Sequence, residues 1–213
     1  MEILIYTALL IPLVPTLLTS FKWKLLNDAQ RWFAYLLWSI VVISLSGEAW
    51  LKNTGQSNLP FFHVYILFEY LLILQIFRHL FKDHVKKITW LILASGFLFI
   101  WLFNVFLGEG IWGFPDYIHA LEAVIILALV FKWFANMLKE KIILNPEKTF
   151  EFWFCAGLLL FFSGNFLLFI FSEFLLSIEQ SAYDVIWKIH CILIILLYLI
   201  YSIALLWVKK TVK

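Results

Sequence analysis

Seven long apolar segments, separated by short polar or turn-rich stretches, account for most of the 213-residue chain. A membrane-spanning helix needs about 20 consecutive, mostly apolar residues, and each segment is close to that length. Transmembrane strands are only about 10 residues long and alternate in polarity, so the segments are predicted to be helices. The predicted spans are approximately 3–20, 32–51, 61–80, 88–107, 117–138, 152–176 and 185–208.

The first segment contains two prolines, Pro12 and Pro15, which are expected to kink the helix because proline lacks a backbone N–H. This segment has an acidic residue, Glu2, and neither a basic n-region nor a small-residue cleavage site. It is therefore expected to be a retained helix rather than a signal peptide. The sequence predicts an all-α, polytopic integral membrane protein: a seven-helix transmembrane bundle that forms a single domain over 1–213.

The distribution of basic residues predicts the orientation of the bundle. Of the 16 Lys and Arg residues, all except Lys52 and Lys188 fall in the odd-numbered connections, at the adjoining helix ends or in the C-terminal tail. Cytoplasmic loops of membrane proteins carry an excess of Lys and Arg. We therefore expect the N-terminus to lie outside and the C-terminus in the cytoplasm.

Composition agrees with a membrane location, because 64% of residues are hydrophobic, 20% are aromatic and only 14% are charged. An ordinary soluble domain is about half apolar and about a quarter charged. The net charge is +2, and the basic residues lie in short scattered clusters, which argues against a nucleic-acid-binding face. The expected surroundings are membrane lipid, and the expected localisation is the cell membrane, as a multi-pass protein of the cell inner membrane.

Polar side chains in the predicted outer half of the helices are candidates for a ligand site. An ionisable residue within a membrane span costs about 2.5 to 3.5 kcal/mol on insertion scales, so each indicates a function by default. His119 and Glu122 are three residues apart, and Tyr65 and Glu69 are four apart, so each pair shares a helix face. We expect one solvated pocket between the third, fifth, sixth and seventh helices. The candidate ligand-binding residues are Glu69, Tyr65, His119, Glu122, Asn165 and His190.

A second hypothesis is an intramembrane metal-dependent hydrolase. His63, His119 and His190 would supply imidazole ligands for Zn²⁺, with Glu69 or Glu122 as a further ligand or as the general base. The sequence contains no HExxH motif. A third hypothesis is a small-solute transporter. Against it, the sequence shows neither the inverted repeat nor the paired interrupted helices that many transporters have.

The chain resembles the seven-helix sensor regions of bacterial histidine kinases in its helix count, orientation and short loops. The resemblance covers the whole chain, although the kinase portion is absent. It implies a sensory or ligand-binding module in signal transduction. Because the cytoplasmic side offers only short loops and the tail VKKTVK, a separate partner would carry the output. That partner would be a cytoplasmic kinase or a membrane partner subunit.

Two other seven-helix classes do not fit the residues. A retinal protein needs a Schiff-base lysine near the middle of its last helix, where this chain reads CILIILLYLIYS. A G-protein-coupled receptor carries an acidic-Arg-aromatic triplet at the inner end of its third helix, where this chain reads IFRHLF. We therefore expect neither retinal nor coupling to a G protein.

Overall fold

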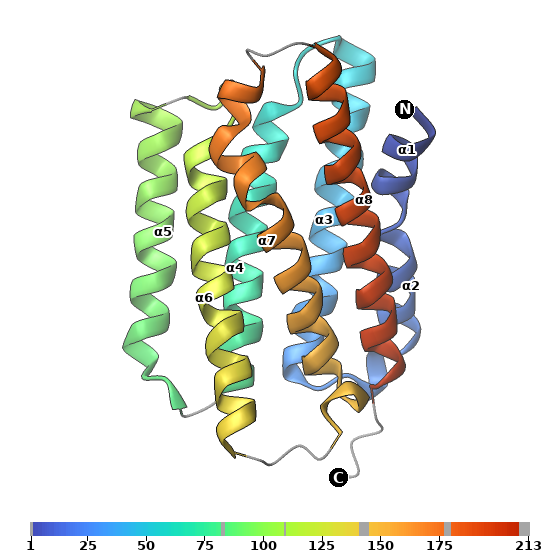
Figure 1. Cartoon of the computed structure of the whole chain (residues 1–213), viewed down its shortest axis with the longest axis vertical. Helices are drawn as coiled ribbons and strands as arrows, with labels where there is room; N and C mark the ends of the chain where they lie inside the picture. The colour runs from blue at the N-terminus through green and yellow to red at the C-terminus, as the bar shows by residue number, and fades with distance from the viewer. Residues whose placement is uncertain (1, 82–83, 109, 141–144, 177–179, 209–213) are drawn as a thin grey trace. The chain divides into compact units, whose positions relative to one another are not determined.

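The computed structural model describes residues 2–81, 84–108, 110–140, 145–176 and 180–208. It describes the side-chain surroundings of all of these except positions 140, 167, 169–176 and 180–183. The described residues contain helices and no strand, which confirms the all-α prediction (Figure 1). The longer helices are α1 (Glu2–Leu10), α2 (Leu13–Phe21), α3 (Asp28–Thr54), α4 (Leu59–Phe81), α5 (Lys87–Leu107), α6 (Asp116–Glu140), α7 (Phe150–Leu176) and α8 (Gln180–Leu206). Two short 3₁₀ helices also occur, η1 (Trp23–Leu25) and η3 (Pro146–Lys148).

Six helical stretches in the described part of the chain are long and apolar enough to cross a membrane. The first of them, Glu2–Phe21, combines α1 with α2, and the described side chains of α7 add a shorter apolar stretch over Phe150–Phe166. These lengths and compositions fit a membrane protein. The seventh span and the orientation stay predictions from the sequence.

The break between α1 and α2 confirms the kink predicted in the first segment. Ile11 and Pro12 form a turn, and Pro12 adopts φ −57° and ψ −24° immediately before α2 begins at Leu13. The Ile11 carbonyl oxygen, whose usual i+4 donor is replaced by Pro15, accepts from the Val14 N–H at 3.0 Å instead, and the Thr16 hydroxyl adds a bond to the Pro12 carbonyl oxygen at 2.7 Å. Such local satisfaction is what allows proline inside an apolar span.

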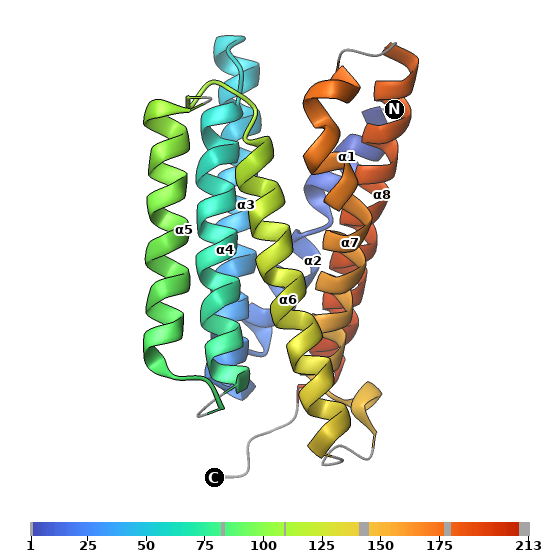
Figure 2. The same ribbon diagram turned by 60° about the vertical axis from the view of Figure 1, so that its left-hand side comes forward.

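Residues 28–122 form one compact unit, here called the central unit. Within it α4 packs along α3 and contacts α5 (Figure 2). Ile66, Ile73 and Phe77 of α4 are fully buried at helical spacing and form the middle of this packing. At one end of α4 the Trp32 indole donates to His79 Nε2 at 3.1 Å, which joins α3 to α4.

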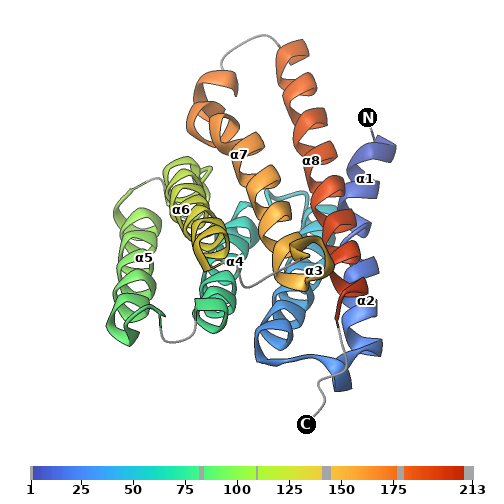
Figure 3. The same ribbon diagram turned by 60° about the horizontal axis from the view of Figure 1, so that its bottom comes forward.

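Residues 1–27 and 123–213 form the other compact unit, the terminal unit. Here α7 packs along α8, and α1 and α2 also pack on α8 (Figure 3). A Cβ at Gly157 of α7 would lie 3.2 Å from side-chain atoms of Leu197, Ile200 and Tyr201, so glycine permits the close approach of α7 to α8. Lys22 Nζ donates to the Leu205 carbonyl oxygen at 2.6 Å and so satisfies an acceptor in the last turn of α8.

Candidate cation-binding site

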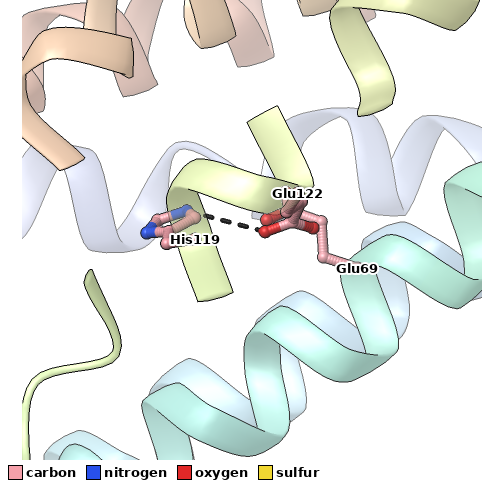
Figure 4. Close-up of side chains that lie close together, drawn as sticks. All are labelled: Glu69, His119 and Glu122. Atoms are coloured by element: carbon pink, nitrogen blue, oxygen red, sulfur yellow. Dashed lines mark ion pairs between the residues drawn. The ribbon is translucent and has the colours of Figure 1, made fainter. Parts of the chain in front are cut away.

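Three titratable side chains of the central unit converge on one point: Glu69 from α4, and His119 and Glu122 from α6 (Figure 4). One ligating atom from each lies within 4.8 Å of the others. His119 Nε2 is 3.7 Å from Glu122 Oε2, as their i, i+3 spacing predicts. We call these three residues the carboxylate–histidine cluster.

The two carboxylates of the cluster lie more than one turn inside their helices, whereas His119 lies in the first turn of α6. Glu69 follows the start of α4 at Leu59 by ten residues, about 15 Å along the helix axis. Glu122 follows the start of α6 at Asp116 by six residues, about 9 Å along that axis. Both helices are among the stretches long and apolar enough to span a membrane.

Both carboxyl groups are removed from solvent. Glu122 is fully buried, and Glu69 and His119 are each 2% exposed. Within the described residues, neither oxygen of Glu122 accepts a hydrogen bond, and Glu69 Oε2 accepts none either. Buried polar groups are nearly always hydrogen-bonded, and buried charges are paired or coordinate metals. Protonation or a bound cation would therefore satisfy three carboxylate oxygens here, the two of Glu122 and Oε2 of Glu69.

Neighbouring aromatic residues hold the cluster in position. The Tyr65 hydroxyl donates to Glu69 Oε1 at 2.9 Å, which confirms the contact expected from their i, i+4 spacing. The ring of Phe62, three residues before Tyr65 on α4, packs edge-on against the His119 ring. The ring centroids are 5.4 Å apart and the interplanar angle is 79°. The same ring contacts Phe114 at 5.5 Å. Phe62 thus fixes the start of α6 against α4.

His63 stands apart from the cluster and ties the connection between α5 and α6 to α4. Its Nε2 lies 3.0 Å from the Gly113 carbonyl oxygen, so that nitrogen donates and is occupied by protein. The His63 carbonyl oxygen in turn accepts a hydrogen bond from the Trp101 indole of α5 at 3.0 Å. His63 therefore links α4, α5 and the segment that leads into α6, and this position suits a structural role.

Asn165 of α7 and His190 of α8 pair with each other in the terminal unit. His190 Nδ1 lies 2.7 Å from Asn165 Oδ1, while Asn165 Nδ2 donates to the Phe161 carbonyl oxygen at 2.9 Å. Since the amide oxygen accepts, the His190 proton is on Nδ1. The Trp187 ring packs on the imidazole at 5.1 Å. These two residues form a polar contact between α7 and α8 within the terminal unit.

The set of side chains that the structure brings together differs in composition from the three-histidine set considered from the sequence. The group that the central unit brings together has one imidazole and two carboxylates. His63 is outside this group, although only its Nε2 is engaged, by Gly113, and its Nδ1 has no hydrogen-bond partner among the described residues. His190 belongs to the terminal unit. Phe62 is the residue of the site that sequence reasoning missed. Nothing distinguishes it from the other 22 Phe residues until the α5–α6 connection brings His119 beside it.

No protein-family model, curated protein or solved structure matches the chain.

Proposed function

We infer that this chain is a membrane ligand-binding protein that takes up a small cation at the carboxylate–histidine cluster. The observation that supports this function is the burial of Glu69 and Glu122 side by side, with three of their four oxygens lacking a hydrogen-bond donor among the described residues. Two negative charges this close in a medium of low dielectric repel each other strongly. A bound cation would remove that cost, and binding would stabilise the fold.

The proposal includes the arrangement in the membrane expected from the sequence. With seven spans and the N-terminus outside, α4 and α6 both begin at the outer face, so the cluster lies in the outer half of the bilayer. A site there responds to cations that arrive from outside the cell. The sensory role, with a cytoplasmic kinase or a membrane subunit as separate partner, agrees with the short inner loops of the chain.

A metal-dependent hydrolase is the second candidate, favoured by the presence of imidazole and carboxylate ligands at one point. Such an enzyme would need a ligand position open to water and substrate. The side chains of His119 and Glu122 are 3% and 0% exposed, which favours binding of a resident ion over turnover of a substrate. Metal-dependent hydrolysis of a fluorescent lipid ester or amide by the purified protein, lost on replacing Glu122 with Gln, would favour the enzyme instead.

Cation binding is tested by thermal unfolding of the purified protein in lipid nanodiscs, first treated with a chelator and then supplied with Zn²⁺, Mn²⁺, Ca²⁺, Na⁺ or methylammonium. We expect at least one cation to raise Tm. A cation present at 100 times its Kd adds about 2.7 kcal/mol of stability, roughly 5 to 10 °C for a chain of this size.

The matched controls are Glu122→Gln, which should lose the response, and Glu48→Gln, which should keep it. Glu48 is also a carboxylate of the central unit, but it lies outside the cluster and pairs with Lys52 at 3.0 Å. An unchanged Tm with all five cations, or an equal response in Glu122→Gln, would overturn the proposal.

A further inference from the structure

This inference rests on the proposed function. The side chains that surround the site indicate which class of cation it binds. We propose that the carboxylate–histidine cluster is a site for one divalent first-row transition-metal ion, ligated by Glu69, His119 and Glu122, with Tyr65 positioning Glu69. The size of the site, the chemistry of its donors and the balance of charge each favour such an ion.

The size of the site favours a single ion over a molecular cation. The three ligating atoms lie within 4.8 Å of one another, and the residues are at most 2% exposed. Around a metal with ligands at about 2.1 Å, tetrahedral donors lie about 3.4 Å apart. The 3.7 Å separation of His119 Nε2 and Glu122 Oε2 is close to that spacing, so small side-chain rotations bring them to a common ion. An alkylammonium would need more room between the same donors.

The donor set distinguishes between classes of metal ion. Na⁺, Mg²⁺ and Ca²⁺ prefer oxygen ligands alone, whereas Zn²⁺ and the neighbouring transition metals accept imidazole nitrogen together with carboxylate. His119 contributes its nitrogen at the point where the two carboxylates meet. One imidazole and two carboxylates therefore indicate Zn²⁺, Mn²⁺, Fe²⁺ or Co²⁺.

The charge balance points the same way. A protonated His119 would offset one of the two carboxylates and leave the other uncompensated, since neither makes an ion pair with Lys or Arg among the described residues. A divalent ion offsets both and leaves His119 neutral, as a ligand must be. It also supplies partners for the oxygens of Glu122 and for Glu69 Oε2, while Glu69 Oε1 keeps its bond from Tyr65. A hydrogen bond of this kind orients a ligating carboxylate.

The test is equilibrium dialysis of the nanodisc-embedded protein against Zn²⁺, together with the visible absorption spectrum of the protein loaded with Co²⁺. We expect one Zn²⁺ per chain and Co²⁺ bands that Zn²⁺ displaces. His119→Ala and Glu69→Gln should each weaken Zn²⁺ binding at least about 100-fold, and Tyr65→Phe about 10-fold.

His63→Ala and His190→Ala are the matched controls, because each removes an imidazole outside the cluster. In these two variants the Zn²⁺ affinity should change less than about 3-fold, far less than on loss of a ligand. Equal losses in the three histidine variants would replace the proposed ligands with a three-histidine set. Absence of Co²⁺ bands and of stoichiometric Zn²⁺ in the folded wild-type protein overturns the transition-metal site. If Ca²⁺, Na⁺ or methylammonium nevertheless raises Tm, the proposed cation-binding function stands without the transition-metal site. If no cation raises Tm, the transition-metal site and the proposed function both fail.

Discussion

Replacing Glu122 with glutamine is expected to make the cation-free protein more stable than the wild type. The substitution keeps the size of the side chain and removes one of two neighbouring carboxyl groups that cannot both ionise in this buried site without strong mutual repulsion. Groups in direct contact are coupled by about 0.5 to 3 kcal/mol. A gain of about 2 kcal/mol corresponds to roughly 4 to 8 °C in Tm for a chain of this size.

Thermal unfolding in the presence of a chelator measures this gain, and a double-mutant cycle identifies its source. Glu69→Gln should give a similar gain, because its amide oxygen can still accept the hydrogen bond of Tyr65. The double variant Glu69→Gln/Glu122→Gln should gain clearly less than the sum, since either single change already removes the repulsion. Lower stability in both single variants would show that the carboxylates support the fold, and would contradict a site kept for binding at a cost in stability.

Cysteine labelling of intact cells is expected to be all-or-none at the helix connections, according to the predicted orientation. The background is the Cys155→Ala/Cys191→Ala variant; both native cysteines are free and buried. Gln56→Cys, in the connection between α3 and α4, should react with a membrane-impermeant maleimide from outside. His84→Cys and Pro146→Cys should react only after the cells are opened.

The physical reason for this expectation is the asymmetry of Lys and Arg, because the cytoplasmic connections of membrane proteins carry an excess of basic residues. His84→Cys and Gln56→Cys form a matched pair, because both positions are exposed and lie at opposite ends of α4. Labelling of Pro146→Cys from outside intact cells would show that the predicted orientation is wrong. The carboxylate–histidine cluster would then lie in the inner half of the membrane.

The helices were readable from the sequence because each apolar segment is long enough to bury its own backbone hydrogen bonds in lipid. The predicted third span, 61–80, matches α4 at Leu59–Phe81 within two residues, and the kink in the first span follows directly from Pro12. Helix ends are set by turn residues and side-chain contacts with little periodic signal. The start of α3 at Asp28, four residues before the predicted 32, is an example.

The proximity of Glu69 and Glu122 also followed from an energetic argument, since two carboxylates separated in lipid would be costlier than two that share a site. Spacing within one helix predicted the neighbours of each: Tyr65 beside Glu69, and His119 beside Glu122. The partner of His63 could not be predicted in this way. It is a backbone carbonyl at Gly113, and its location depends on how the α5–α6 connection turns at Gly110, which has φ +76°.

The central claim is that Glu69, His119 and Glu122 together hold a cation, which we assign to the transition metals. The most direct test is the metal content of the protein extracted from membranes and purified without added metal or chelator, measured by inductively coupled plasma mass spectrometry. We expect close to one divalent transition-metal ion per chain in the wild type and in Glu48→Gln, and almost none in Glu69→Gln/Glu122→Gln. A folded wild-type protein with no more metal than the double variant would contradict it.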